Sequence, residues 1–291
     1  MTLVNLNDVL LDAKKGSYAV GAFNFTDIST ARGIVSAAEK SNAPVVLQFA
    51  QSHLPYMSLE EVGINAIQLA KRASVPVVVH LDHGEDVATA MKALKMGFSS
   101  VMLDFSLKPF KENVKATKEV VEIAHDLGAS VEGEIGVMTK DDGTGKPDYS
   151  HLTDKYTKVE DAKKFYDLTH VDALAVSFGT VHGIYREKPH LNFERLHEIS
   201  EALPIPLVMH GGSGLSDEEY RNSIKNGITK INYYSVMSFN VVNGLRDYLN
   251  ARRDKQTFLY DCDMEVIKLV EEDLLKKIKI FGSTDTALVT K

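Results

Sequence analysis

Three histidines at the ends of apolar segments are the residues best suited to chemistry in this chain. His83 ends VVVHLDH, His182 lies in SFGTVHG and His210 ends PLVMH, and a glycine follows each of them. If these segments are parallel strands of one barrel, their ends meet on one face. Three imidazoles gathered there would form a zinc site that leaves a coordination position open for substrate.

Three carboxylates are expected close to these histidines. Asp82 directly precedes His83, where it suits general acid or base chemistry beside a metal, or the orientation of an imidazole or the capping of the next helix. Asp104 and Glu134 are also expected at strand ends. Burying an unpaired carboxylate costs several kcal/mol, so both should have partners. Their spacing fits a second cation and hydrogen bonds to the histidines equally well.

Two further segments predict a phosphate site. A glycine-rich turn follows the strand that ends at His210, and a short polar segment precedes a helix after the next strand. Glycines let backbone N–H groups approach an anion, and a helix N-terminus attracts negative charge. In barrels, the loops after strands seven and eight are the usual phosphate site. The residues are Gly211, Gly212, Ser213, Asn232, Tyr233, Tyr234 and Ser235.

The elements that must position these groups are eight strand and helix pairs. Apolar runs typical of buried parallel strands alternate with segments of helical period, and Asp27, Ser58 and Ser216 are helix-start signals. The pattern predicts an α/β fold, a (β/α)8 TIM barrel with an additional C-terminal helix. The expected strands are residues 19–24, 44–49, 76–81, 99–104, 130–135, 173–177, 206–210 and 229–232.

Two segments depart from this alternation. Residues 136–158 are polar and have no clear period, and a loop of about twenty residues is usually functional, so we interpret it as a mobile lid. Residues 261–280 form an amphipathic helix that should cover the barrel or a neighbouring subunit. We therefore expect residues 1–291 to form a single barrel domain.

Composition narrows the class of protein. The chain has 291 residues, of which 44% are hydrophobic and 25% charged, the balance of a soluble globular protein. A net charge of −7 gives no reason to expect nucleic acid as a partner. No apolar run approaches the roughly 20 residues of a membrane span. The single cysteine, Cys262, cannot form an intrachain disulfide, and together with the absence of an apolar N-terminal segment this favours the cytoplasm.

Six ordered motifs identify a family resemblance. They are HLDHG, SVMLDxSxxPFxENV, SVEGEIG, GTVHGIY, PLVMHGGSG and KIN. In this order and at these intervals they resemble the class II zinc-dependent ketose-bisphosphate aldolases, which include fructose-1,6-bisphosphate and tagatose-1,6-bisphosphate aldolases. The resemblance extends over essentially the whole chain. It implies reversible cleavage of a phosphorylated ketose to dihydroxyacetone phosphate and an aldehyde. The additional C-terminal helix favours a homodimer or homotetramer.

The resemblance also implies roles for single residues. His83, His182 and His210 match the ligands of the catalytic Zn²⁺, and Asp82 matches the acid/base for the C4 oxygen. Asp104 and Glu134 match positions that hold a second or alternative cation, divalent or monovalent, in some members of the family. Gly183 and the seven residues of the two phosphate segments match the site of dihydroxyacetone phosphate.

Three departures from the family pattern concern the substrate. Tyr233 and Tyr234 stand where relatives have small groups, so their rings should reshape the pocket wall. The lid has no glutamate before Glu160, which leaves Asp141 or Asp142 to exchange the proton at C3. No residue clearly matches an arginine for a distal phosphate. Lys108, Arg186, Arg252 and Arg253 are the candidates.

Alternative functions rest on other residues. A Schiff-base aldolase needs a lysine inside the barrel, where Lys230 is the candidate. A barrel metallohydrolase would use a His-x-His pair in the first strand, which has no histidine. A related aldolase of another phosphorylated sugar or sugar acid, and a non-catalytic sugar-phosphate-binding protein, also fit the motifs.

Two of the remaining histidines are expected near the site. His80 should pack or hydrogen-bond inside the barrel, and His53 follows a strand on the expected active face.

Overall fold

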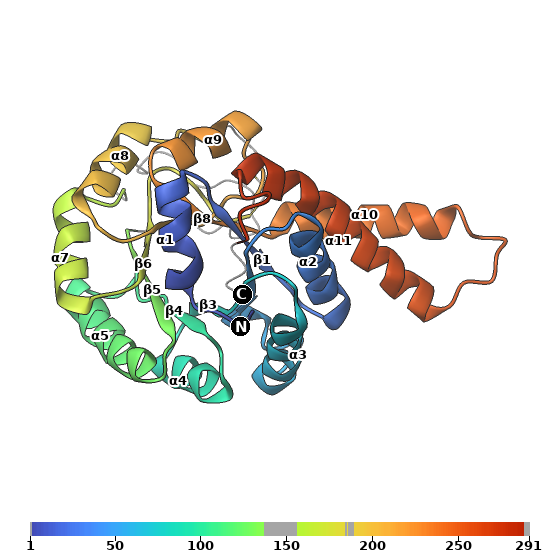
Figure 1. The fold of residues 1–291 in the computed structure, drawn as a ribbon, viewed down its shortest axis with the longest axis horizontal. Coiled ribbons are helices and arrows are strands. Elements are labelled where there is room, and N and C mark those ends of the chain that lie inside the picture. Colours follow the sequence, from blue (N-terminus) through green and yellow to red (C-terminus); the bar gives the residue numbers. More distant parts are fainter. Residues whose placement is uncertain (1, 137–155, 184, 186–188, 288–291) are drawn as a thin grey trace.

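A closed barrel of eight parallel strands forms the centre of the molecule. The computed structural model describes residues 2–136, 156–183, 185 and 189–287 (Figure 1). The strands pair in chain order, and β1 closes the ring against β8. This confirms the predicted TIM barrel. The strands are β1 (Val20–Asn24), β2 (Val45–Ala50), β3 (Val77–Gly84), β4 (Ser100–Leu103), β5 (Ser130–Ile135), β6 (Ala173–Val176), β7 (Leu207–Met209) and β8 (Ile228–Tyr233).

Helices surround the barrel and begin at the residues that cap them. Asp27, Ser58 and Ser216 each accept a hydrogen bond from the third backbone N–H of their helix, which confirms the predicted start signals. The outer helices are α2 (Ile28–Lys40), α3 (Leu59–Arg72), α4 (Val87–Met96), α5 (Phe110–Asp126), α7 (Val159–Thr169), α8 (Phe193–Ala202), α9 (Asp217–Lys225), α10 (Ser235–Asn250) and α11 (Leu259–Phe281). The last of these confirms the expected C-terminal helix.

The N-terminal helix α1 (Leu6–Gly16) closes the bottom of the barrel. Its apolar residues form one buried cluster with inward-facing strand residues near the N-terminal strand ends. The cluster contains Leu6, Val9, Leu10, Ala13, Val20, Ala22, Val46, Val78, Ala173, Ala175 and Val208. With the bottom filled by side chains, the interior is open only toward the carboxyl ends of the strands.

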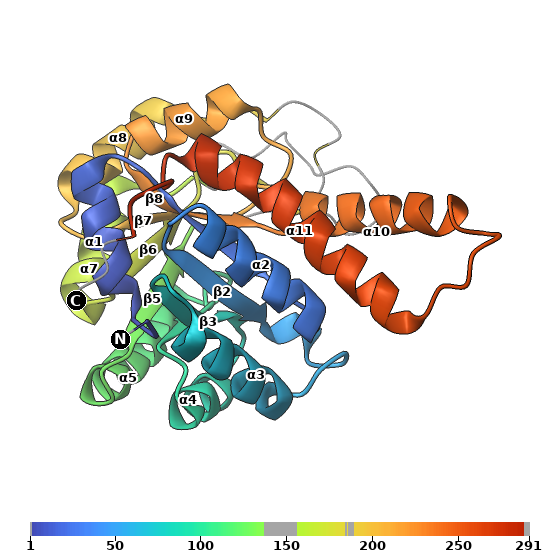
Figure 2. The same cartoon turned by 45° about the vertical axis from the view of Figure 1, so that its right-hand side comes forward.

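Helices α10 and α11 form an arm that projects from the barrel (Figures 1 and 2). The two helices run side by side in both views, and the C-terminal part of α11 returns to pack on α2 and the barrel. Val270, Leu274, Ile278 and Phe281 are its buried residues. Within the described residues, no helix combines the length and the hydrophobicity needed to cross a membrane.

Candidate active site

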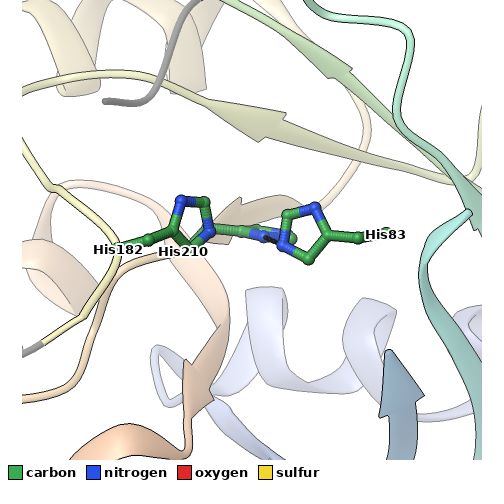
Figure 3. Close-up of side chains that lie close together, drawn as sticks. All are labelled: His83, His182 and His210. Carbon is green, nitrogen blue, oxygen red and sulfur yellow. Dashed lines mark hydrogen bonds between the residues drawn. The ribbon is translucent and has the colours of Figure 1, made fainter. Parts of the chain in front are cut away.

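The three histidines predicted as metal ligands come together at the open end of the barrel (Figure 3). Strand β3 continues to Gly84, past its predicted end, and its pairing with β4 is irregular between Leu81 and Gly84. His83 at this irregularity has a φ of 47°, a left-handed conformation that reorients its side chain. Its ring centroid lies 4.5 Å from that of His210 and 5.0 Å from that of His182.

Two of the three rings are fixed by carboxylates behind them. His83 Nδ1 lies 2.9 Å from Asp104 Oδ2, and His210 Nε2 lies 2.7 Å from Glu132 Oε1. The nitrogens left over, His83 Nε2 and His210 Nδ1, face each other at 2.9 Å. Carboxylates behind imidazoles are the usual means of fixing the tautomer and orientation of histidine ligands.

His182 completes the group without any partner of its own. Both ring nitrogens are buried, and neither has a hydrogen-bond partner among the described residues. Burial, helped by His83 and His210, holds the pKa of His182 well below its usual value, so the imidazole is neutral. One nitrogen from each histidine lies within 4.8 Å of the others. Three convergent nitrogens with an unsatisfied imidazole among them suit a tetrahedral metal ion.

The facing nitrogens of His83 and His210 are close enough to share a proton. Burial lowers the pKa of His83, but Asp82 and Asp104 outweigh this and raise it to about 9. At neutral pH, His83 is therefore an imidazolium that donates from Nε2 to His210 Nδ1. A metal ion bound to both nitrogens would replace this proton, as metal binding at histidines generally does.

Asp82 is held beside the histidines by two amides. Asn24 Nδ2 donates to one carboxylate oxygen at 2.8 Å, and Asn232 Nδ2 donates to the other at 3.1 Å. Burial raises the pKa of Asp82, but the charges of His83 and His210 lower it more, so it lies well below the ordinary value. Asp82 is thus a fixed, ionised carboxylate inside the site.

Asp104 and Glu134 have different surroundings. Asp104 accepts hydrogen bonds from His83 and, at 2.7 Å, from Ser106 Oγ, which fits the role of holding a histidine. Glu134 Oε2 is buried and has no partner among the described residues. Burial and the negative Asp104 raise the pKa of Glu134 well above its usual value. His83, Asp104 and Glu134 also form a second group of possible metal ligands, with one atom from each within 4.8 Å of the others.

A cavity of about 160 Å³ opens beside these groups. It is lined by Asp82, His83 and His182, by the glycine-rich turn, and by the segment that leads into α10. Its lining is Asn24, Ala50, Ser52, His53, Asp82, His83, His182, Gly183, Gly211, Gly212, Ser213, Asn232, Tyr233, Tyr234 and Ser235. All eight residues predicted to bind substrate therefore line one cavity with Asp82.

The lining carries the backbone features of an anion site. Gly211 has a φ of 65°, and a Cβ at this position would lie 2.4 Å from the Val181 carbonyl oxygen, so only glycine fits without movement. Helix α10 begins at Ser235, and no side chain of the described residues caps it. Its first N–H groups are left to meet an anion at the cavity.

The two tyrosines after Asn232 point in different directions. Tyr233 is the last residue of β8, and its hydroxyl donates to Asp273 of α11 at 2.9 Å, outside the barrel. Tyr233 lines the cavity, but alternation along β8 turns Asn232 inward and directs the Tyr233 hydroxyl outward to α11. The Tyr234 ring lies 5.2 Å from the His53 ring, so this pair stands on the cavity side.

His53, which the sequence placed on the active face, is part of the cavity wall. Its ring packs between those of Phe49 and Tyr234, and burial lowers the pKa of His53. Four other polar residues of the site had no assigned role in binding or metal ligation: Asn24, Gln48, Glu132 and Lys230. All four are buried on barrel strands whose residues are largely apolar. A polar side chain within such a run is the sequence signal that marks them.

Three of the four candidates for a distal phosphate lie in the described part of the chain, and none of these three lines the cavity. Lys108 is exposed, outside the lining. Arg252 and Arg253 follow the far end of α10, and its 16 residues carry the chain roughly 24 Å from Ser235. Within one chain these arginines cannot reach the site. Arg186, Asp141, Asp142 and most of the predicted lid lie outside the described residues.

Comparisons with known proteins agree with this geometry. The model of the family "Fructose-bisphosphate aldolase class-II" matches residues 4–286. A sulfofructosephosphate aldolase of Alkalicoccus urumqiensis is 37% identical over 289 residues, 99% of each chain. A fructose-bisphosphate aldolase of Staphylococcus aureus is 34% identical over 293 residues, which cover 99% of this chain and 100% of the relative.

A solved structure resembles the whole barrel. The YdjI aldolase from Escherichia coli K12 superposes with a TM-score of 0.86 at 33% sequence identity, covering 98% of this chain and 99% of the other. The match includes the arm as well as the barrel, since it leaves only a few residues uncovered. Together with the family model and the curated relatives, it shows that the chain belongs to the class II fructose-bisphosphate aldolase family.

Proposed function

We propose that this protein is a zinc-dependent aldolase that cleaves a phosphorylated ketose to dihydroxyacetone phosphate and an aldehyde. The observation that carries the proposal is His182, whose two buried nitrogens have no hydrogen-bond partner among the described residues while it faces the oriented rings of His83 and His210. Such an arrangement leaves a nitrogen lone pair from each ring for a metal ion. Family membership supports the same reaction class.

Zinc is the proposed metal because all three donors of the first group are imidazoles. Three histidines leave a fourth position of a tetrahedral site for substrate. Bound there, zinc would act as a Lewis acid that polarises the ketone and stabilises the negative charge released by cleavage. Asp104 and Glu132 already orient two of the rings for this purpose.

Asp82 is the proposed base in the cleavage direction. Its ionised carboxylate, held by Asn24 and Asn232, takes the proton of the C4 hydroxyl as the C3–C4 bond breaks. The electron pair of that bond remains on the three-carbon half, which then receives a proton at C3. We propose Asp141 or Asp142, in the segment outside the described residues, as the donor of this proton.

The phosphate of the three-carbon half is proposed to bind between two backbone elements. Gly211, Gly212 and Ser213 form one side, and the uncapped start of α10 at Ser235 forms the other. Gly183, with a φ of 106°, brings a third stretch of backbone to the same cavity. Backbone N–H groups and the helix dipole bind a phosphate without a dedicated cationic side chain.

A second cation is proposed at His83, Asp104 and Glu134. Glu134 Oε2 has no hydrogen-bond partner within the described part of the chain, and the pKa of this carboxyl is raised. Both observations support the proposal, since a cation would allow the buried carboxyl to ionise. Both metal groups use His83, so the two positions would be alternatives rather than independent sites.

Fructose-1,6-bisphosphate and tagatose-1,6-bisphosphate are the substrates that we propose first. The curated relatives act, by their names, on fructose bisphosphate and on sulfofructose phosphate. The described cavity lining contains no lysine or arginine, so the distal substituent must be recognised elsewhere. Another phosphorylated sugar or sugar acid therefore belongs in any substrate panel.

The experiment is a panel of ketose mono- and bisphosphates, including fructose bisphosphate, tagatose bisphosphate and sulfofructose phosphate, assayed for triose-phosphate release. Activity should disappear with a chelator and return with zinc, and borohydride plus substrate should not inactivate the protein. Covalent trapping by borohydride would instead support a Schiff base. No cleavage of any ketose phosphate would favour a protein that only binds sugar phosphates.

We also propose a cytoplasmic homodimer or homotetramer. The arm exposes apolar side chains that its own barrel does not cover, namely Phe239, Val242, Phe258, Leu259, Tyr260 and Met264. Apolar surface gathered in this way typically marks a protein contact. Light scattering coupled to size-exclusion chromatography would measure the mass, and a monomer at micromolar concentration would contradict the proposal.

A further inference from the structure

A buried lysine contacts a neighbour of the proposed metal ligands and a neighbour of the proposed base. Lys230 is fully buried, and its Nζ forms an ion pair with Glu132 Oε2 at 2.9 Å. The same Nζ donates a hydrogen bond to Asn232 Oδ1 at 2.8 Å. Glu132 contacts His210, and Asn232 contacts Asp82. One ammonium group thus stands behind both a metal-ligand candidate and the proposed base.

Packing alone does not account for this lysine. Removing an ion pair from water costs several kcal/mol for each ion, and apolar residues of similar volume are often as stable or more stable. Such residues, Val46, Val78 and Val208 among them, fill the lower part of the barrel interior, and Val208 is the strand neighbour of Lys230. His80 does not share the charge of Glu132, since burial and Lys230 lower the pKa of His80 to about 3. The charged pair needs a reason beyond stability.

Lys230 fixes which atoms of Asn232 donate hydrogen bonds and which accept them. Lysine has three donors and no acceptor, so Asn232 must turn its amide oxygen toward Lys230. Its NH₂ group is then directed at Asp82 Oδ1, 3.1 Å away. A flipped amide would place its oxygen against the Asp82 carboxylate and its donors against the ammonium. Lys230 therefore decides the orientation of Asn232, which in turn holds Asp82.

The hydrogen bonds on the metal side of the site are fixed in the same way, through Glu132. Glu132 Oε2 lies 2.9 Å from Lys230 Nζ, and in this ion pair the glutamate is a carboxylate. An ionised carboxylate only accepts, so His210 must carry its proton on Nε2, 2.7 Å away. This leaves the Nδ1 lone pair turned toward His83. Lys230 thus pairs with the carboxylate that fixes this tautomer.

We infer that Lys230 is a positioning residue that sets the metal side of the site through Glu132 and the base side through Asn232. The inference rests on the proposed metal-dependent function and adds a role for a residue that touches neither metal nor substrate. It also gives the strand lysine a part in the site other than Schiff-base formation.

The test compares Lys230→Met with Glu132→Gln and with the control Lys14→Met. Lys14 donates to the Leu203 and Ile205 carbonyl oxygens at 2.9 and 3.0 Å, at the closed end of the barrel, so its loss is a matched removal of lysine hydrogen bonds. For each protein, zinc affinity is measured by competition with a chromogenic chelator in the absence of substrate. Then kcat and KM are measured at saturating zinc, and folding is followed by circular dichroism.

Lys230→Met should lower zinc affinity about 10- to 100-fold, the usual loss when the partner of a metal-bound histidine is disturbed. At saturating zinc its kcat should still fall about 10- to 100-fold, because Asp82 is misoriented, with KM changed far less. Glu132→Gln should also lower zinc affinity, and at saturating zinc its kcat should fall less than that of Lys230→Met, since Lys230 still holds Asn232. Lys14→Met should alter neither quantity.

Wild-type zinc affinity and kcat in a folded Lys230→Met protein would overturn the inference, as would borohydride trapping of substrate on Lys230. If Lys230→Met does not fold, the double variant Glu132→Gln/Lys230→Met removes both charges and should show both losses. A wild-type protein that binds no zinc would contradict the proposed function instead, so the two failures are distinguishable.

Discussion

The inner surface of the barrel has a lower and an upper region built from the same strands. In the lower region Val46, Val78 and Val208 pack against α1 and are fully buried in an apolar cluster. Two residues further along the same strands stand Gln48, His80 and His210, which are equally buried but polar. Residues two apart on a strand point to the same side. The inner surface therefore changes from apolar to polar over two residues of each of these strands.

This difference separates what stabilises the fold from what does the chemistry. The lower region needs only apolar residues of the right size, because α1 seals it from water. The upper region instead contains a connected set of donors, acceptors and charges in which nearly every member depends on its neighbours. The predictions below test whether substitutions in the two regions have separable effects.

The largest effect is expected from Asp82→Asn in the upper region. The amide keeps the shape of the side chain but cannot accept the C4 hydroxyl proton. We expect kcat to fall about 10²- to 10⁴-fold, the typical worth of general acid–base catalysis, with zinc affinity within a few-fold of wild type. Steady-state kinetics and a chelator competition measure the two quantities. An Asp82→Asn protein with wild-type kcat would remove Asp82 from the mechanism.

The lower region should respond in the opposite way to Leu10→Ala. Leu10 is fully buried in α1 against the barrel floor, and truncating a buried leucine lowers the free energy of unfolding by about 2–5 kcal/mol. Because Leu10 belongs to the apolar floor and does not line the cavity, kcat and KM at a temperature where the variant is folded should match wild type. Denaturant unfolding with parallel kinetics tests this, and a large loss of kcat would couple the two regions.

A smaller effect is expected from Gly211→Ala, with Gly128→Ala as its control. Gly211 has a φ of 65°, and a Cβ there would meet the Val181 carbonyl oxygen at 2.4 Å. Strain of this kind costs about 1–3 kcal/mol and must move the proposed phosphate loop, so KM should rise about tenfold. Gly128 has a φ of 74° but open space around its Cβ position. Its substitution should leave KM unchanged, and an equal rise in both variants would contradict the assignment of the loop.

The smallest effect concerns the outer layer, where Glu271 of α11 joins α2. Its carboxylate accepts from Lys40 at 2.6 Å and from Ser36 at 2.5 Å. Burial raises the pKa of Glu271, but these two partners lower it below the ordinary value. A lowered pKa stabilises the fold above the unfolded-state pKa, and this contribution is lost as the pH falls through the folded-state pKa.

Glu271→Gln should therefore reduce stability at pH 7 by less than about 1 kcal/mol, as for other surface pairs. The difference from wild type should shrink below about pH 4, where the unfolded carboxyl also takes up its proton. Thermal unfolding at several pH values measures it, with activity at pH 7 unchanged. A difference that grows toward acid pH would have the wrong sign.

Much of the barrel follows from local sequence patterns. Buried strands alternate with helical segments, and capping residues such as Asp27 and Ser58 fix helix starts through contacts three residues away. The meeting of His83, His182 and His210 also follows, since a parallel barrel gathers all its strand ends on one face. These predictions depend only on which end of a strand a residue occupies.

The remaining features depend on long-range contacts that no local pattern encodes. The apolar spacing of Leu6, Val9 and Leu10 is compatible with a helix, but not with any one place for it in the fold. The pairing of Glu132 with Lys230 joins strands that are far apart in the chain and depends on the stagger of the barrel. The outward direction of the Tyr233 side chain depends on whether β8 extends to this residue. The ends of strands are the part of secondary structure that sequence predicts least well.

The central claim is that the upper region holds a catalytic metal through three histidines. Its most direct test is a zinc titration of the metal-free protein by calorimetry, together with the His182→Ala variant. The account predicts one high-affinity zinc per chain, weakened at least about tenfold by His182→Ala, with cleavage of a ketose phosphate appearing in proportion to bound zinc. Equal affinity in the two proteins, or full cleavage by the metal-free protein, would contradict it.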